Sequence, residues 1–211
     1  MGDPVAGNPT QYMLEQAFAV ADLDWRFLTF EVAARDFEGA LRGARIFDFQ
    51  GLMLAPPHRG RVHPYLEQVT DAARISGQVN CIARSGDQLC GHNTEGPAFR
   101  RLLEKHTRCE GLHVAVLGAG RMGRSIATEL ALGKVKSLIF YCINPDQPRQ
   151  YVEAVKNETP VSECRIEPWP SEGLLQLPDA CDLLINATPI GRHDPTAEIP
   201  LDLATLSSDT K

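Results

Sequence analysis

The second half of the chain alternates apolar runs with helical patterns. Strands are predicted at residues 113–117, 136–143, 164–167 and 182–186, and helices at residues 124–132 and 149–156. The strands at 113–117 and 182–186 are apolar at nearly every position, as expected when a strand is buried on both faces of a parallel sheet. The alternation of strand and helix therefore predicts a parallel sheet covered by helices.

The first half gives a mixed pattern. A helix is predicted at residues 13–23, an alternating strand at 26–32, helical turns over 61–75, short strands at 78–83 and 89–91, and a helix at 97–106. Pro56 and Pro57 require a turn, since proline continues neither a helix nor a central strand. We therefore expect an α/β protein of two halves, residues 1–106 and 107–211, the second of them the parallel sheet covered by helices. One large domain or two small ones both fit this length.

Charge and length narrow the function classes. The 211 residues carry 21 Lys and Arg against 27 Asp and Glu, a net charge of −6, without basic runs. This balance disfavours nucleic acid and anionic membranes as partners. No apolar run approaches the roughly 18 residues that span a bilayer, so we expect a cytoplasmic protein. The six cysteines lack metal-ligand spacing, which favours reduced thiols and no metal site.

A glycine-rich segment lies between a predicted strand and a predicted helix. Its residues, spaced G-x-G-x-x-G, are Gly118, Ala119, Gly120, Arg121, Met122 and Gly123. The glycines allow a tight turn, close approach of the backbone to a pyrophosphate, and close packing of helix on strand. The free N–H groups at the helix start would face the anion. The segment predicts dinucleotide binding.

The residues after the second strand of this half bear on cofactor choice. A carboxylate there would accept from the ribose 2′-hydroxyl of NAD, whereas an arginine would pair with the 2′-phosphate of NADP. The chain offers both Asp146 and Arg149 after Asn144. These two cues conflict and leave both cofactors open.

A second polar cluster lies in the first half. Asn93 and Glu95 follow Asn80 by a short hairpin, and clustered amides suit a polyhydroxylated ligand. Glu95 is a candidate general base. An asparagine and threonine near a glycine are, by themselves, more typical of a turn that caps a helix.

Taken together, these motifs resemble the shikimate dehydrogenase family. The matching stretches are GDPVA from Gly2, GLMLAPPHR from Gly51, GQVNCI up to Ile82, GHNTEG from Gly91, LGAGRMG from Leu117 and INATPIG from Ile185. The resemblance implies an N-terminal domain that binds shikimate and a C-terminal Rossmann domain that binds NADP. It also implies reversible hydride transfer between 3-dehydroshikimate and shikimate, a step of chorismate and aromatic amino acid biosynthesis.

The resemblance carries over to single residues with departures. Asn8 and Thr10 stand where the family has two substrate-binding serines, and Met53 and Ala55 replace an asparagine and a threonine. Asn80 and Asn93 match family substrate contacts. Matching cofactor positions are Asn144, Arg149, Thr188, Pro189 and Ile190, although one phosphate-binding arginine of the family is absent. NADP is therefore preferred, with NAD as the alternative.

The catalytic pair is changed. Arg59 and Glu95 stand where the family has lysine and aspartate. A guanidinium stays protonated and cannot act as a general base, although it can polarise an oxygen, while Glu95 could take the base role. His58 beside Arg59 is a third titratable candidate, expected in a surface loop.

Three functions stay open on these residues. The first is an NADP-dependent shikimate dehydrogenase, the second a non-catalytic relative that binds the dinucleotide, and the third a dehydrogenase for quinate, another polyol or hydroxy acid. Each implies a small-molecule substrate and a monomer or homodimer. The family pattern further includes a strand before Gly2 and elements after Leu201 that this sequence lacks. We therefore predict a chain truncated at both ends.

Overall fold

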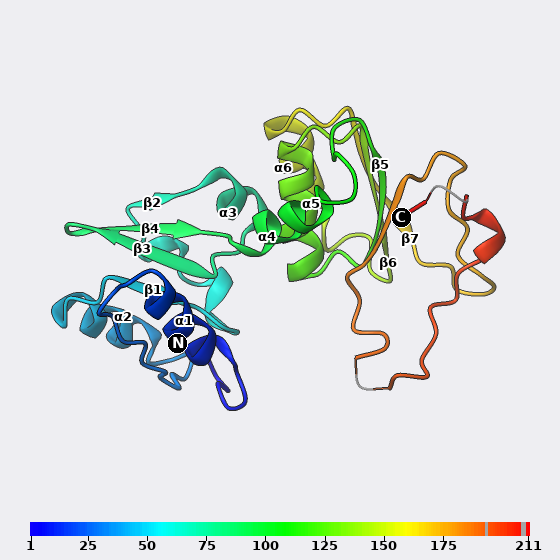
Figure 1. Ribbon diagram of the computed structural model, residues 1–211. Coiled ribbons are helices and arrows are strands. Elements are labelled where there is room, and N and C mark those ends of the chain that lie inside the picture. Colours follow the sequence, from blue (N-terminus) through cyan, green and yellow to red (C-terminus); the bar gives the residue numbers. More distant parts are fainter. Residues whose placement is uncertain (193, 208–209) are drawn as a thin grey trace. The chain divides into compact units, whose positions relative to one another are not determined.

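The computed structural model describes residues 1–192, 194–207 and 210–211. Contacts divide the chain into two compact units (Figure 1). Unit 1 consists of Met1–Thr70 and Val79–His92, and unit 2 of Asp71–Gln78 and Asn93–Lys211. Residues 93–106 belong to unit 2 because Phe99 and Leu103 pack against its core. The domain boundary near residue 106 stays a prediction about where two domains join.

Unit 2 is built on a parallel sheet. Its strands are β5 (His113–Leu117), β6 (Ser137–Cys142), β7 (Glu163–Pro168) and β8 (Leu183–Asn186), in the spatial order β7-β6-β5-β8. Its helices are α3 (Asp71–Ser76), α4 (Glu95–Leu103), α5 (Arg121–Leu132) and α6 (Arg149–Glu158), with a short turn η3 (Leu203–Thr205). The predicted parallel sheet is confirmed, and every neighbouring pair of strands runs in parallel.

The two faces of this sheet are covered differently. Val116 and Phe140 face a core that includes Leu130 of α5 and Val155 of α6, and Figure 1 shows both helices beside the sheet. On the other face, Leu117, Ile139 and Tyr141 pack with Leu175, Leu177 and Cys181 of the irregular segment after β7. Burial on both faces explains why β5 and β6 are largely apolar.

Unit 1 holds a mixed four-stranded sheet. Its elements are α1 (Thr10–Val20), α2 (Phe37–Ile46), β1 (Gly51–Met53), η1 (His58–Gly60), η2 (His63–Tyr65), β2 (Gln68–Val69), β3 (Cys81–Ser85) and β4 (Gln88–His92). The order is β1-β3-β4-β2, with β2 parallel to β4 and the other pairs antiparallel. An α/β fold is therefore present in both units.

One predicted element of unit 1 is wrong, and another is right only in part, since η2 and α3 are helical but residues 66–70 are not. Residues 26–32 form no strand in the structure, and Gly2 forms only an isolated bridge with Glu31. The helical turns predicted over 61–75 are interrupted because Leu66 is extended and the following residues pair with β4. Apolar periodicity alone does not report which neighbouring strand is available for pairing.

The core of unit 1 centres on α2 and η1. Phe37, Leu41 and Ala44 lie on one face of α2 and are buried. The Phe37 ring stacks on the His58 imidazole at a centroid distance of 4.4 Å. His58, expected at the surface, is instead fully buried, with its Nε2 2.8 Å from the carbonyl oxygen of Val32. It therefore fixes the turn that carries Arg59.

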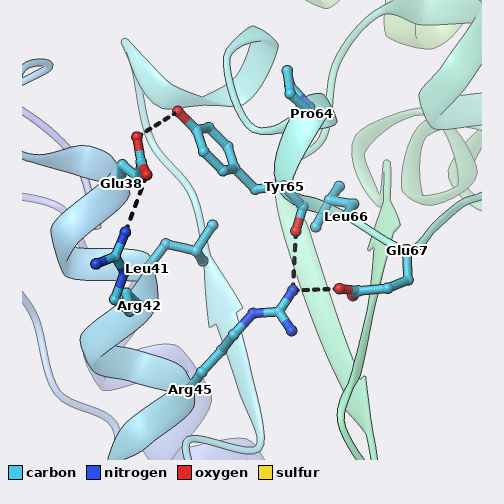
Figure 2. A pocket seen from close by; sticks show the side chains of 8 residues that line it. All are labelled: Glu38, Leu41, Arg42, Arg45, Pro64, Tyr65, Leu66 and Glu67. Carbon is cyan, nitrogen blue, oxygen red and sulfur yellow. Dashed lines mark hydrogen bonds and ion pairs between the residues drawn. The ribbon is translucent and has the colours of Figure 1, made fainter.

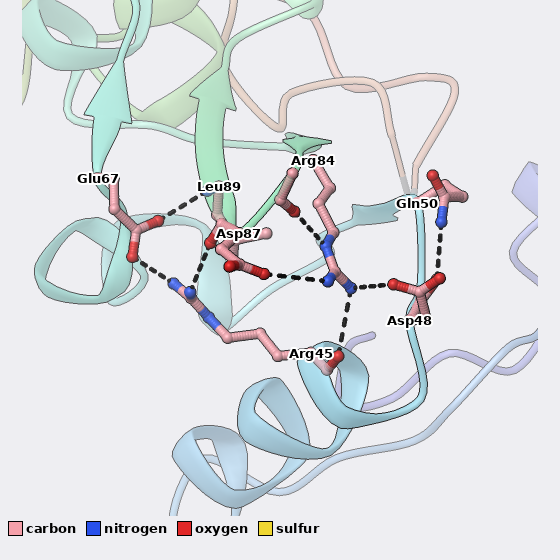
Figure 3. A network of polar contacts seen from close by, with 8 residues as sticks. Arg45, Asp48, Gln50, Glu67, Arg84, Asp87 and Leu89 are labelled. Atoms are coloured by element: carbon pink, nitrogen blue, oxygen red, sulfur yellow. Dashed lines mark hydrogen bonds and ion pairs between the residues drawn. The ribbon is translucent and has the colours of Figure 1, made fainter.

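A polar network joins α2 to the sheet. Arg45 on α2 donates to the Glu67 carboxylate at 2.7 Å and to the Tyr65 carbonyl oxygen at 3.1 Å, and it lines a pocket between α2 and residues 64–67 (Figure 2). Glu67 in turn accepts from the backbone N–H of Leu89 at 2.7 Å (Figure 3). The Leu89 hydrogen bond, followed by that of Arg45, lowers the pKa of Glu67. Glu67 thus connects α2 to β4.

Replacing Glu67 with glutamine should destabilise unit 1 by about 1 kcal/mol at neutral pH, because a neutral amide accepts more weakly from Leu89 and Arg45. The lowered pKa means that this contribution is present above the ordinary glutamate pKa and lost as the pH falls through the folded-state value. Urea unfolding of both forms at neutral and acid pH measures it.

Glu38→Gln is the matched control, because the contacts of Glu38 with Arg42 and with the Tyr65 hydroxyl both lie at the exposed surface (Figure 2). Hydrogen exchange at the Leu89 amide should quicken in the Glu67 variant alone. Equal stability of wild type and Glu67→Gln at neutral pH would contradict this role.

Candidate functional site

A pocket in unit 1 brings three of the predicted site residues together. Asn8, Thr10 and Arg59 line it, together with Met53 and Ala55. The remaining lining residues are Met1, Val5, Gln11, Phe27, Thr29 and Leu54. Segments from the start of α1, the end of β1 and η1 thus converge on a small space. Its wall combines amides, hydroxyls and a guanidinium with apolar side chains.

The hydroxyl groups of this pocket are already bonded within the chain. Thr10 donates through its Oγ1 to Asn8 Oδ1 at 2.5 Å, and its backbone N–H donates to the same oxygen at 3.0 Å. Thr29 donates to Gln11 Oε1 at 2.8 Å. A hydroxyl has one proton to donate, so the two threonine oxygens can only accept a hydrogen bond from a ligand. The sequence did not single out Thr29, because it is distant from α1 along the chain.

Arg59 is half-buried on η1. Its Nε donates to the carbonyl oxygen of Leu54 at 2.9 Å, and Leu54 N–H donates to the carbonyl oxygen of Asn80 at 2.8 Å. Asn80 is itself buried, directly before β3. The backbone of residues 54 and 80 therefore sets the position of the guanidinium in unit 1.

Asn93 belongs to unit 2 and is also buried. Its Nδ2 donates to Ser125 Oγ at 2.7 Å and to Ser76 Oγ at 3.2 Å. Its Oδ1 accepts from the backbone N–H groups of Glu95 at 3.0 Å and Gly96 at 3.4 Å. These bonds use the full capacity of the amide. Asn93 therefore ties the start of α4 to α3 and α5, and its contact with a substrate stays a prediction.

Glu95 is the first residue of α4 and is half-buried. The backbone N–H of Glu95 donates to Asn93 Oδ1, which fixes the backbone position from which the Glu95 side chain extends. Ser76 and Ser125, which hold Asn93, were missed by sequence reasoning. No local pattern marks them, since they lie on α3 and α5.

The glycine turn of unit 2 leads from β5 into α5. Gly118 has a φ of +94°, and a Cβ at Gly123 would come within 2.2 Å of the Gly118 carbonyl oxygen. A Cβ at Gly120 would meet nothing within 4 Å. Gly120 caps α5 without a side-chain hydrogen bond, which leaves the first N–H groups of the helix for a ligand. This geometry fits a pyrophosphate.

The other predicted cofactor residues flank this turn. A Cβ at Gly118 would lie 3.2 Å from Thr188 Cγ2, so the segment with Thr188, Pro189 and Ile190 passes beside the glycines. Thr188 bonds to Asn186 through its backbone N–H and its hydroxyl. At the end of β6, Asn144 Oδ1 accepts from Asp146 N–H at 3.2 Å. These loops lie at the carboxyl edge of the sheet, where Rossmann units bind ligands.

Other chemistries find little support in the part of the chain that the structure describes. There, no group of three or more His, Cys, Asp and Glu side chains is arranged to hold a metal ion. All six cysteines are free, and four are buried, which raises the pKa of Cys164 to about 12. Within the same residues, no helix is long and apolar enough to cross a membrane.

The chain is similar to known proteins of one family. Residues 1–82 match the family model of the shikimate dehydrogenase substrate binding domain. A shikimate dehydrogenase (NADP(+)) from Symbiobacterium thermophilum is 32% identical over 206 residues, which cover 96% of this chain and 69% of that protein. The chain belongs to the shikimate dehydrogenase family. The family that the sequence motifs suggest is thereby confirmed.

Solved structures agree with this family and its two-domain fold. The ligand-free 5-ketofructose reductase of Gluconobacter sp. strain CHM43 is 33% identical, with a TM-score of 0.91, covering 99% of this chain and 74% of that one. A shikimate dehydrogenase in complex with NADP+ is 25% identical, with a TM-score of 0.83, covering 99% of this chain and 72% of that one. Proteins named for two different activities therefore share a fold similar to that of this chain.

Ser125→Ala should destabilise unit 2 by about 1–3 kcal/mol, because it leaves a buried Asn93 N–H without its closest partner. Denaturant unfolding measures this loss. Ser85→Ala at the exposed end of β3 is the matched control and should change stability by less than about 0.5 kcal/mol. Equal effects of the two substitutions would show that Ser125 does not support Asn93.

Proposed function

We propose that this protein is an NADP-dependent oxidoreductase of the shikimate dehydrogenase type, which interconverts 3-dehydroshikimate and shikimate. The observation that carries the proposal is the family relationship over nearly the whole chain, together with a glycine turn of dinucleotide-binding geometry. The reaction is a step of aromatic amino acid biosynthesis, and such an enzyme would work in the cytoplasm as a monomer or homodimer.

NADP is the proposed cofactor. The backbone of residues 118–123 would hold its pyrophosphate, and Asn144, Arg149 and the segment 188–190 would line the rest of the site. The open space beside Gly120 and the uncapped start of α5 support this assignment. When bound, the nicotinamide accepts or gives the hydride. NAD is the alternative cofactor.

Arg59 and Glu95 are the proposed catalytic residues. Arg59 stays protonated and would stabilise charge on the reacting oxygen, because a guanidinium does not give up its proton in proteins. Glu95 would take the hydroxyl proton during oxidation and return it during reduction. Asn8, Thr10 and Asn80 are proposed to position the substrate hydroxyls, and Asn93 would bind substrate by exchanging one of its bonds within unit 2. The hydrogen bonds from Arg59 Nε to the Leu54 carbonyl oxygen and from Glu95 N–H to Asn93 Oδ1 support fixed positions within their own units.

Reduction of an uncharged polyhydroxylated ketone is a second candidate function. The 5-ketofructose reductase is 33% identical to this chain and its fold is closely similar. In the unit 1 pocket, Thr10 and Thr29 give their hydroxyl protons to Asn8 and Gln11, so their oxygens accept from a ligand. Acceptors suit a sugar hydroxyl better than a carboxylate. Quinate, another hydroxy acid, or binding of dinucleotide without turnover are the remaining alternatives.

Incubation of the protein with shikimate and NADP+ should produce NADPH, followed by absorbance. The double variant Arg59→Lys with Glu95→Asp restores a titratable lysine and a shorter carboxylate, so kcat should rise by roughly tenfold or more. Each single substitution is the control for the pair. No turnover with shikimate or quinate under either cofactor, while calorimetry still detects NADP+ binding, would favour a non-catalytic relative.

Measuring kcat/KM for 3-dehydroshikimate and for 5-ketofructose with NADPH distinguishes the two substrate classes. Met53→Asn with Ala55→Thr adds polar groups at two positions of the pocket wall. This change should move the preference toward 3-dehydroshikimate by about thirtyfold, because two new hydrogen bonds of about 1 kcal/mol each add up to about 2 kcal/mol. A preference for 5-ketofructose in the wild type would establish the second candidate and exclude the first.

A further inference from the structure

The predicted NADP residue Arg149 is not an isolated positive charge. It begins α6, and its Nη2 lies 2.8 Å from Asp146 Oδ1, with both side chains about three quarters exposed. The loop after β6 is therefore close to neutral at this point. A 2′-phosphate carries a charge of about −1.5 to −2 near neutral pH. Arg149 alone would offer it a cation whose charge is balanced by a neighbouring carboxylate.

Arg124 on α5 supplies a cation of a different kind. Its Nε donates to the carbonyl oxygen of Ala119 at 3.0 Å, and its Nη2 donates to that of Gln147 at 3.4 Å. The guanidinium therefore links the glycine turn to the loop after β6. Its carbon also lies 5.3 Å from the ring centroid of Tyr151. Among the residues that the structure describes, no carboxylate pairs with Arg124.

The position of Arg124 indicates which part of the dinucleotide its guanidinium would contact. In Rossmann units the pyrophosphate lies at the start of the first helix and the adenosine ribose at the end of the second strand. Contact with both Ala119 and Gln147 places the guanidinium between these regions. The Tyr151 hydroxyl lies 3.1 Å from the Arg124 carbonyl oxygen, so backbone and side chain are both anchored. The Nη1 donors stay available to a ligand oxygen.

We propose that Arg124 is the residue that makes this site prefer NADP, by binding the 2′-phosphate that Arg149 alone cannot attract strongly. The proposal rests on the function proposed above. In the cluster of Arg124, Arg149 and Asp146, the carboxylate pairs with Arg149 and leaves the guanidinium of Arg124 to a ligand. Arg124, directly after Gly123 on α5, would supply the positive charge of the family arginine that is absent from the loop after β6.

Calorimetric titration with adenosine 2′,5′-bisphosphate and with 5′-AMP tests the proposal without turnover. Arg124→Gln should weaken the bisphosphate by tenfold or more, about 1.4 kcal/mol, and change 5′-AMP by less than about twofold. Arg149→Gln, the matched control, should lose less, because the Arg149 guanidinium is already held by Asp146 in an ion pair. Asp146→Asn should tighten the bisphosphate. Arg124→Lys keeps a charge and should retain part of the preference.

Two results with the Arg124→Gln variant would overturn the assignment. One is an equal loss of both ligands in Arg124→Gln, with unchanged thermal unfolding, which would make Arg124 a support of the glycine turn only. The other is unchanged binding of the bisphosphate. If the wild type binds both ligands equally, this inference fails while dinucleotide binding stands. If the wild type binds neither ligand, the proposed function fails together with it.

Discussion

The close approach of Gly123 to the carbonyl oxygen of Gly118 is the constraint on which unit 2 depends. A side chain at Gly123 would overlap that oxygen, so only glycine allows α5 to start directly beside the end of β5. The helix then buries Ile126 and Leu130 against the sheet and directs its first N–H groups to the carboxyl edge. Packing of the core and the anion-binding geometry therefore have one common cause.

Unit 1 holds its pocket by a different means. No single turn defines it, since Thr10, Thr29, Met53 and Arg59 come from four separate segments. Hydrogen bonds between these segments, such as that of Thr29 to Gln11, fix their relative positions. Buried His58, stacked on Phe37, supports η1, the turn that carries Arg59. The chemistry offered to a substrate is thus set by bonds within the pocket wall as much as by residue identity.

Sequence reasoning succeeded where a signal is local. The strand at 113–117 and the glycine turn are marked by consecutive apolar residues and by spacing, and the structure places both at those residues. It failed at residues 26–32, where alternation suggested a strand but the backbone forms only one bridge. It also overlooked Arg124 and Ser125, because their partners lie on other elements. Pairing and long-range hydrogen bonds depend on neighbours that a pattern along one segment does not contain.

The exposed pair of Asp146 and Arg149 has an energetic consequence for how the site changes over evolutionary time. Ion pairs at the surface contribute only about 0–1 kcal/mol, so neither partner is needed for folding. Position 146 can therefore accept substitutions at little cost in stability, while a neutral residue there would change the charge of the proposed cofactor site. At this position the charge of the site can drift without damage to the core, whereas Arg124 also bonds to the glycine turn and cannot.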